Sequence, residues 1–298
     1  MSVEKGAAEA AKVQLSTSQP PDPQRRSGQQ EGSSHPPSKG SEGSSLRIPP
    51  LRAGLEIHQQ LDTRAKLFCA CPTRLVDRDP DFSVLRRLRP THSEMGQVDR
   101  AALFESTRQK DFTYQGHFGS VCLVELDEEP PHELNREAVE VALTVAAMMN
   151  MKPVDEIHVM RKIVIDGSNT TGFQRTAKVA FDGWVEVEGK KVSIQSLCLE
   201  EDAARKVSES PEGAVYRLDR LGIPLVEVTT GPDITSGEDA ERVALAIGRI
   251  LKATGKMKRG LGTIRQDLNV SVEGGTRVEI KGVQELGAIS TVVEYEAL

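Results

Sequence analysis

Charged side chains alternate with apolar ones in several short segments of this chain, with the two-residue period of a β-strand. Glu56 and His58 share one face of a segment whose other face carries leucine and isoleucine. Within residues 264–270, Arg265 and Asp267 likewise lie opposite aliphatic side chains. Carboxylates gathered around a hard cation, with arginine and lysine nearby, suit a magnesium–nucleotide site. The pattern therefore indicates a polar sheet face with that chemistry.

Further acidic residues follow the same pattern elsewhere in the chain. Glu227 lies on the opposite strand face from its neighbours Val226 and Val228. In another segment, an apolar strand ends in three consecutive acidic residues at positions 200–202. Glu279 and Lys281 lie on the second half of a hairpin predicted over 264–281. For any single strand, the solvated face of an antiparallel sheet explains the alternation equally well. The recurrence of Arg, Asp, Asn, Glu and Lys across paired strands favours a functional site.

A loop rich in Gly, Ser, Thr and Asn occupies residues 166–174 and is closed by Arg175. Backbone N–H groups and hydroxyls in such a loop can bind phosphate or acceptor groups, and the arginine adds charge. An ordinary hairpin loop has the same composition. The spacing alone leaves both interpretations open.

Two segments that would support these strands have the helical period, residues 133–149 and 236–251, with Ser236 as an N-cap. Most of the remainder alternates, and hairpins are predicted over 184–201 and 264–281. The sequence has neither the alternation of strands and helices of βαβ units nor a Gly-rich phosphate-binding loop, which argues against Rossmann and Walker-type folds. We therefore predict an α+β fold with a largely antiparallel sheet and helices packed on one side.

Composition divides the chain into two parts. Residues 1–46 are rich in Ser, Pro and Gly, and they carry too few large apolar side chains to order themselves, so we predict a disordered tail there and a folded domain over 47–298. No targeting segment and no membrane-spanning run is apparent. The formal net charge of −6 argues against a surface that binds nucleic acid throughout. We expect a soluble cytoplasmic protein.

The cysteines are Cys69, Cys71, Cys122 and Cys198, and of these only Cys69 and Cys71 are close in sequence. A structural zinc site usually needs two such pairs. Reduced, partly buried thiols are therefore the favoured interpretation, and zinc at Cys69 and Cys71 stays open.

Several long motifs together resemble the GatB/GatE family of tRNA-dependent amidotransferase subunits. The resemblance extends from Leu51 to the last residue. The residue types at positions 59–60 and 169–174 are most similar to those of the GatE branch. The motifs occupy residues 54–63, 66–72, 166–176, 199–203, 222–227, 262–271, 279–283 and 294–296.

The resemblance implies a glutamine-synthetase-like cradle that uses ATP and Mg²⁺ to phosphorylate the γ-carboxylate of glutamate on glutamyl-tRNA. Ammonia then displaces the phosphate, so the protein would belong to the carbon–nitrogen ligases. The ammonia would come from an amidase- or asparaginase-like partner of the GatD type, in a heterodimer or a dimer of heterodimers. No activated Ser, Cys or Thr nucleophile is evident, so the chain is not expected to release ammonia itself.

The resemblance also assigns roles residue by residue. The metal ligands would be His58, Glu201 and Glu227. Glu56, Asp267 and Glu279 would complete the acidic site, and Arg265 and Lys281 would stabilise phosphoryl charge. The residues bordering nucleotide and acceptor would be Asp166, Ser168, Asn169, Thr170, Thr171, Gln174 and Arg175.

Members of the family continue beyond the region of Glu294 into a tRNA-contacting part, which we expect to be absent from this chain. Two other interpretations remain. One is a GatB-type subunit of a three-protein complex that also acts on aspartyl-tRNA(Asn), and the other is a non-catalytic tRNA-binding scaffold. The set of Glu56, His58, Glu201, Glu227 and Asp267 favours catalysis, because a scaffold has no need of it.

Overall fold

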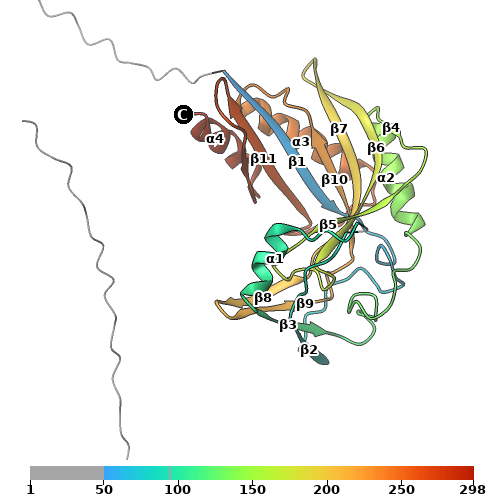
Figure 1. Ribbon diagram of the computed structural model, residues 1–298. Helices are drawn as coiled ribbons and strands as arrows, with labels where there is room; N and C mark the ends of the chain where they lie inside the picture. The colour runs from blue at the N-terminus through green and yellow to red at the C-terminus, as the bar shows by residue number, and fades with distance from the viewer. Residues whose placement is uncertain (1–49, 94) are drawn as a thin grey trace, which may run out of the picture. The chain divides into compact units, whose positions relative to one another are not determined.

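The computed structural model describes residues 50–93 and 95–298 (Figure 1). The tail predicted over residues 1–46 lies outside the described residues. The described chain combines α-helices with largely antiparallel sheets, so it is of the α+β class. Whether it resembles the glutamine synthetase cradle stays a prediction.

Within the described residues, the main sheet has eight strands in the order β12-β11-β1-β10-β7-β6-β4, with β5 also paired to β6. Its neighbouring strands are antiparallel throughout. The strands are β1 (Leu51–Gln60), β4 (Lys152–Pro153), β5 (Val159–Ile163), β6 (Phe173–Val187), β7 (Lys190–Glu201), β10 (Pro224–Thr230), β11 (Ile264–Val272) and β12 (Val278–Ile280).

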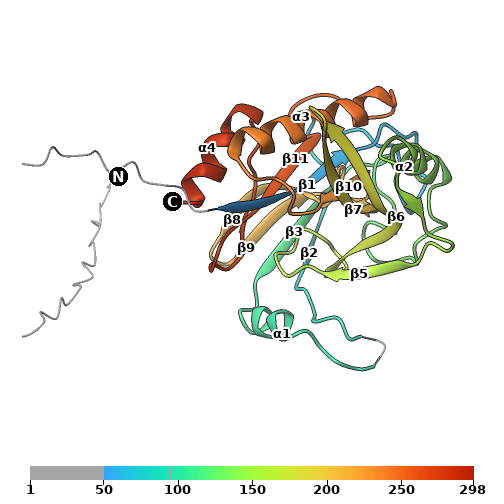
Figure 2. The same cartoon turned by 90° about the horizontal axis from the view of Figure 1, so that it is seen from above.

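One face of the main sheet is apolar and carries the core. Leu55 and Ile57 of β1 and Leu197 of β7 are almost fully buried there, as the alternation predicts. Helices α2 (Arg136–Met148), α3 (Gly237–Ala253) and α4 (Leu286–Glu296) cover the face; α2 packs on β6 and β7, α3 on β1, and α4 on β11. Figure 2 shows the three helices on one side of the sheet. The three helices do not pack on the opposite face, which carries the charged side chains of β1, β10 and β11.

The two helices predicted from periodicity are confirmed. The helix α2 begins after Asn135, whose side chain accepts a hydrogen bond from the N–H of Ala138. The helix α3 begins after Ser236, whose hydroxyl accepts from the N–H of Asp239, and Glu238 and Asp239 complement the helix dipole. The helix α4 was not predicted.

Both predicted hairpins form. The turn between β6 and β7 consists of Glu188 and Gly189, both with positive φ, which matches the right-handed twist of the strands. β11 pairs with β12 through Asn269 opposite Glu279. The strand alternation predicts Val278 on the inward face, but Val278 is exposed because β12 lies at the edge of the sheet.

A second, smaller sheet was not foreseen. Among the described residues it has four strands in the order β2-β3-β9-β8, and its β3–β9 pair is parallel. Tyr114 and Tyr216 stack within its core and donate hydrogen bonds to the carbonyls of Gly167 and Asp166, which fix the loop after β5. The strands are β2 (Phe82–Arg86), β3 (Asp111–Gly116), β8 (Arg205–Ser210) and β9 (Gly213–Arg217); helix α1 (Arg100–Thr107) lies between β2 and β3 in the chain.

None of the helices in the described part of the chain is both long enough and apolar enough to cross a membrane.

Candidate functional site

Four acidic and basic side chains from three adjacent strands meet on the open face of the main sheet. Glu56 and His58 come from β1, and His58 lies directly opposite Glu227 of β10. Glu200 comes from β7, the next strand across. His58 Nε2 lies 3.4 Å from Glu56 Oε1, 3.3 Å from Glu227 Oε2 and 3.7 Å from Glu200 Oε2. This acidic cluster is the candidate site.

Lys162 of β5 extends across the sheet to the same acids. Its Nζ lies 3.6 Å from Glu200 Oε1 and 3.6 Å from Glu227 Oε2. Burial lowers the pKa of Lys162, but the charges of Glu200, Glu227 and Glu56 outweigh it, so the pKa rises above its ordinary value. Lys162 is thus a cation held over the carboxylates.

Burial and mutual repulsion set the protonation of the cluster. Burial raises the pKa values of Glu56 and Glu200, and the negative charge of Glu227 raises both further. Burial also acts on Glu227, but its hydrogen bond with His58 and the charge of Lys162 lower its pKa to about 2. Burial lowers the pKa of His58, and the surrounding carboxylates raise it overall. Such a set of acids is stabilised by added positive charge.

The residues fit a hard divalent cation. One ligand atom each from Glu56, His58 and Glu227 can be chosen so that all three lie within 4.8 Å of one another. Within the described part of the chain, Glu200 Oε2 is buried without a hydrogen-bond partner. An orphaned carboxylate oxygen beside three potential ligands is what a bound cation would satisfy, and an oxygen-rich set suits Mg²⁺.

Arg265, Asp267, Glu279 and Lys281 extend the same face on β11, on β12 and just after it. Arg265 Nη2 lies 2.9 Å from the buried carboxylate of Asp202. Lys281 Nζ lies 2.8 Å from Glu279 and 3.8 Å from Asp267. The prediction that Arg265 and Lys281 share one face with Asp267 and Glu279 is confirmed by this hairpin register.

A cavity of about 170 Å³ connects the two groups. His58 and Glu200 line it together with Arg265 and Asp267, and Gln174 of β6 lines it as well. Of the loop predicted to border the substrate, Gln174 is therefore the residue that reaches this cavity.

The predicted convergence of Glu201 with His58 and Glu227 is wrong. Glu201 points to the other side of β7, where its carboxylate accepts hydrogen bonds from Arg175 Nη1 at 3.2 and 3.3 Å. The reason is the strand period, because Glu201 shares a face with the buried Leu199, whereas Glu200 shares the open face.

Arg175 is consequently not available to a ligand at the acidic cluster. It is buried against Glu201 and lies over the rings of Phe173 and Phe68, at 5.3 and 5.7 Å. Most of the predicted binding loop is likewise occupied by internal contacts. Asn169 and Thr170 are buried, and the Thr170 hydroxyl donates a hydrogen bond to the carbonyl of Glu125. The Thr171 hydroxyl donates to the carbonyl of Phe173. The Asp166 carboxylate accepts a hydrogen bond from the N–H of Ser168.

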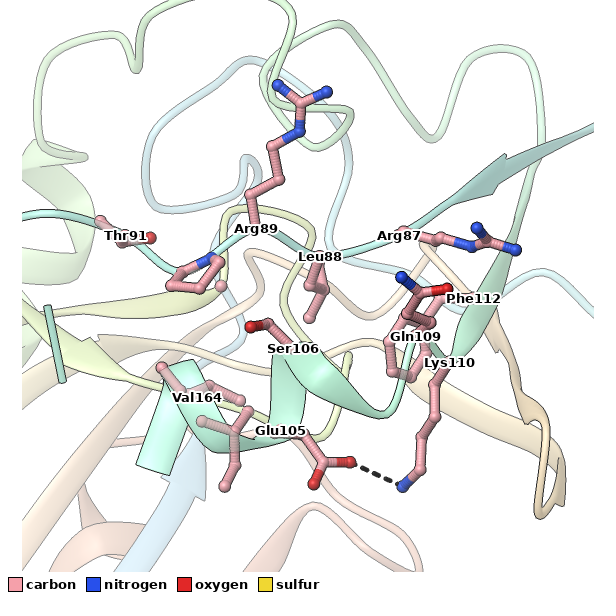
Figure 3. A pocket seen from close by; sticks show the side chains of 14 residues that line it. Arg87, Leu88, Arg89, Thr91, Glu105, Ser106, Gln109, Lys110, Phe112 and Val164 are labelled. Atoms are coloured by element: carbon pink, nitrogen blue, oxygen red, sulfur yellow. Dashed lines mark ion pairs between the residues drawn. The ribbon is translucent and has the colours of Figure 1, made fainter. Parts of the chain in front are cut away.

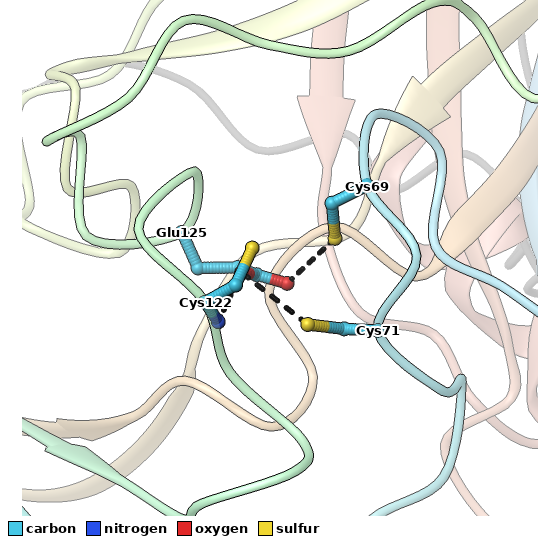
Figure 4. Close-up of side chains that lie close together, drawn as sticks. All are labelled: Cys69, Cys71, Cys122 and Glu125. Carbon is cyan, nitrogen blue, oxygen red and sulfur yellow. Dashed lines mark hydrogen bonds between the residues drawn. The ribbon is translucent and has the colours of Figure 1, made fainter.

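Beneath this loop, a second group of potential ligands gathers around Glu125 (Figure 4). Cys69, Cys71 and Cys122 offer sulfur atoms that, with a Glu125 oxygen, all lie within 4.8 Å of one another. Cys69 donates a hydrogen bond to Glu125 at 3.1 Å, and the N–H of Cys122 donates at 2.9 Å. Three thiols and a carboxylate suit a softer ion such as zinc. The carboxylate already pairs with the fully buried Lys66, whose Nζ is 2.8 Å away.

Sequence analysis does not point to Lys162 or Glu125, and it includes Glu200 and Asp202 only as members of the acidic run at 200–202. Glu200 was recognisable from the strand period, since it alternates with the apolar Leu199. Lys162 and Glu125 have no comparable local signal, because each meets its partners through segments distant in sequence.

A helix-backed antiparallel sheet with a carboxylate-rich open face defines an α+β domain with a candidate divalent-cation site. The sequence matches the model of the GatB/GatE catalytic domain over residues 51–298. The chain therefore belongs to this family.

Similar proteins include several archaeal glutamyl-tRNA(Gln) amidotransferase subunits of the E type. The chain is 59% identical to that of Methanocaldococcus jannaschii over 248 residues, which cover 83% of the chain and 39% of the relative. For Archaeoglobus fulgidus the identity is 60% over 249 residues (83% and 40%), and for Sulfolobus acidocaldarius 60% over 247 residues (83% and 39%). The chain thus spans about two fifths of the length of these relatives.

Proposed function

We propose that this chain carries the ATP-using site of a tRNA-dependent amidotransferase that converts glutamate on tRNA(Gln) into glutamine. The observation that carries the proposal is the convergence of Glu56, His58, Glu200, Glu227 and Lys162 on one open sheet face. Family membership and the names of the similar proteins support the choice of substrate.

The chemistry explains why charge must be gathered at one place. A carboxylate reacts poorly with ammonia because its oxygen is a poor leaving group. Transfer of the γ-phosphoryl group of ATP to the γ-carboxylate releases ADP and turns that oxygen into the bridging oxygen of an acyl phosphate. Ammonia then attacks the carbonyl carbon, the C–O bond breaks, inorganic phosphate leaves and a proton is released. The product is the amide.

The residues of the acidic cluster have complementary parts in this scheme. Glu56, His58, Glu200 and Glu227 would hold Mg²⁺, which supplies positive charge beside the phosphoryl oxygens when bound. Lys162 adds a fixed cation on the same face. Arg265, which lines the cavity, and Lys281, on the same sheet face, would stabilise charge on the transferred group, with Asp267 and Glu279 orienting Lys281.

The proposal assigns ammonia production to a partner. An amidase-like subunit of the GatD type would release it, within a heterodimer or a dimer of such heterodimers in the cytoplasm. In a test, the purified chain is incubated with radiolabelled ATP, Mg²⁺, ammonium chloride and glutamyl-tRNA(Gln). We expect phosphate release that depends on the acylated tRNA. We also expect glutaminyl-tRNA, which is detected as glutamine after mild alkaline hydrolysis and separation of the amino acids.

A matched pair of variants sharpens the test. Glu200→Gln should abolish both products, whereas Glu156→Gln, at an exposed position, should leave them unchanged. Binding of glutamyl-tRNA without phosphate release at any ammonium concentration would indicate a tRNA-binding scaffold instead and would contradict the proposal.

A further inference from the structure

Arg265, which lines the cavity beside the acidic cluster, is held more firmly than an arginine at the surface. Its guanidinium contacts Asp202, whose side chain is 1% exposed. In a larger cavity of about 250 Å³ beside helix α1, Arg87 (Figure 3) pairs with Asp111, but these two side chains are 61% and 42% exposed. Exposed ion pairs are weak because water screens them, whereas a charge-assisted hydrogen bond to a buried carboxylate fixes its partner.

Both terminal nitrogens of the Arg265 guanidinium contact Asp202. Arg265 Nη2 lies 2.9 Å from Asp202 Oδ1, and Nη1 lies 3.5 Å from Asp202 Oδ2. Nη1 also lies 3.4 Å from the carbonyl oxygen of Gly262. Within residues 50–93 and 95–298, the Nε–H of Arg265 donates to no protein acceptor. The restrained guanidinium therefore keeps a donor for an anionic ligand in the cavity.

Asp202 is itself fixed by several hydrogen bonds. Gln60, the last residue of β1, is buried, and its Nε2 donates a hydrogen bond to Asp202 Oδ2 at 2.5 Å. The N–H of Ala203 donates to Asp202 Oδ1 at 2.9 Å. The N–H of Asp202 donates to the carbonyl of Ile223 at 2.8 Å. These bonds hold the carboxylate, and through it the guanidinium of Arg265, in one orientation.

The alternative role for Asp202 is to neutralise Arg220. Arg220 Nε lies 3.8 Å from Asp202 Oδ2, which is beyond hydrogen-bond distance. Its guanidinium donates instead to the carbonyls of Ala203 and Ala204, at 2.8 and 2.9 Å. Arg220 is therefore held by other partners, whereas Arg265 makes its shortest contact with Asp202. This difference favours Arg265 as the residue that Asp202 orients.

We infer that Asp202 and Gln60 are positioning residues that hold the Arg265 guanidinium at the cavity beside the acidic cluster. The inference rests on the proposed function, in which Arg265 stabilises charge on the transferred phosphoryl group. An arginine side chain has many rotamers, so fixing it before the reaction places its charge where phosphoryl charge develops. Misplacement of such a group by about 1 Å can lower a rate by about a hundredfold.

Two buried aspartates offer a matched test. Asp202→Asn and Asp219→Asn each remove the charge of a buried carboxylate that pairs with an arginine, since Asp219 Oδ2 lies 2.6 Å from Arg205 Nη2. Asp219 lies outside the lining of the cavity. Phosphate release dependent on glutamyl-tRNA(Gln) is measured with the full chain, ATP, Mg²⁺ and ammonium chloride. Urea unfolding measures the stability of each variant.

We expect Asp202→Asn to lower kcat by about tenfold or more, with little change in KM for glutamyl-tRNA(Gln). Asp219→Asn should lose stability but keep the kcat of the wild type. Gln60→Met keeps Asp202 and removes one of its donors, so it should lower kcat in the same direction even if Asp202→Asn does not fold. In an Arg265→Ala background, Asp202→Asn should lower kcat no further, because both residues act through one guanidinium.

A second measurement does not depend on turnover. Phenylglyoxal modifies the guanidinium of arginine, and mass spectrometry of the Arg265 peptide gives the rate. We expect this rate to rise by about tenfold in Asp202→Asn, because a charge-assisted hydrogen bond is lost. The rate should also rise in Gln60→Met, and Asp219→Asn should leave it unchanged.

Three outcomes would overturn the inference while leaving the proposed function intact. The first is the kcat of the wild type in both Asp202→Asn and Gln60→Met, and the second is an equal loss of kcat in Asp219→Asn. The third is a double variant of Asp202→Asn and Arg265→Ala in which the two losses multiply, because Asp202 would then act independently of Arg265. A wild-type chain that releases no phosphate would instead refute the proposed function. The phenylglyoxal rates would still decide the positioning, since equal rates in Asp202→Asn and the wild type would refute it as well.

Discussion

Glu200 and Glu201 are neighbours in β7, yet their carboxylates lie on opposite sides of the main sheet. Glu200 Oε2 is 3.7 Å from His58 Nε2, whereas Glu201 accepts hydrogen bonds from Arg175 on the buried side. Because adjacent strand residues alternate, one of the two acids can join the open acidic cluster and the other can neutralise a buried arginine. The two residues should therefore respond differently to substitution.

Glu200→Gln is expected to lower the affinity for Mg²⁺ by about tenfold or more, because it removes one carboxylate from the candidate cation site. Its effect on folding should be small or stabilising. Burial and the charge of Glu227 raise the pKa of Glu200, which means that its ionised form is unfavourable in the fold. Calorimetric titration with Mg²⁺ and urea unfolding measure the two quantities. Unaltered Mg²⁺ affinity would remove Glu200 from the site.

Glu201→Ala is expected to show the opposite pattern. It leaves the guanidinium of Arg175 buried without its carboxylate partner, at a cost of about 3–5 kcal/mol in the free energy of unfolding. If the variant remains folded, its Mg²⁺ affinity should equal that of the wild type. A large loss of Mg²⁺ affinity with unchanged stability would show that Glu201 is a ligand after all.

The buried pair of Lys66 and Glu125 predicts a large stability effect near the cysteines. Lys66 Nζ contacts Glu125 at 2.8 Å and the carbonyls of Ser120 and Leu218 at 3.0 and 3.2 Å. Glu125→Ala should reduce the free energy of unfolding by about 3–5 kcal/mol, because the lysine is left buried without its counter-charge. Glu128→Ala removes an exposed partner of an arginine and should cost about 1 kcal/mol or less.

The same pair predicts how this contribution changes with pH. Burial raises the pKa of Glu125, but Lys66 and the N–H of Cys122 outweigh it, so the folded-state pKa lies below its ordinary value. A lowered carboxyl pKa stabilises the fold above the unfolded value of about 4.3, and this stabilisation is lost as the pH falls through the folded value. The stability difference between the wild type and Glu125→Gln should be constant near neutrality and shrink below about pH 4. A difference that grows on acidification would contradict this sign.

Local periodicity was enough to place the strands of the candidate site. Alternation around Glu56 and His58, and around Arg265 and Asp267, correctly assigned their side chains to one face, because one side of the sheet must be buried. The same rule assigns Glu200 to that face. At Glu201 the motif resemblance and the strand period predict different faces, and the structure follows the strand period.

Contacts between distant segments could not be predicted in the same way. The parallel pairing of β3 with β9 joins Asp111 to Gly213, about a hundred residues apart, and no local pattern encodes it. Asp202 meets Arg265 for the same reason, and Glu125 meets Cys69 across a loop. Side chains that depend on such contacts become visible only in the folded chain.

Cys122 should react slowly with alkylating reagents near neutral pH. Burial and the hydrogen bond with Glu125 raise the pKa of its thiol to about 11, and the reactive form is the thiolate. The rate of modification by iodoacetamide, followed by mass spectrometry of the Cys122 peptide, should rise until about pH 11. Glu125→Gln should shift this profile to lower pH. A rate at neutral pH that rises sharply only after a chelator is added would instead reveal thiolates held by a metal ion.

Arg265→Ala is expected to separate catalysis from cation binding. Arg265 is held by Asp202 at 2.9 Å, and Asp202 also accepts a hydrogen bond from Gln60 at 2.5 Å, so loss of the arginine leaves the buried carboxylate with a partner. If its role is to stabilise transferred phosphoryl charge, phosphate release dependent on glutamyl-tRNA should fall by about a hundredfold. Mg²⁺ affinity, measured by calorimetry, should change little because the acidic cluster is untouched. Arg277→Ala, at an exposed position in the turn after β11, serves as the control and should retain full activity. Equal losses of activity in both variants, or a parallel loss of Mg²⁺ binding in Arg265→Ala, would contradict the assigned role.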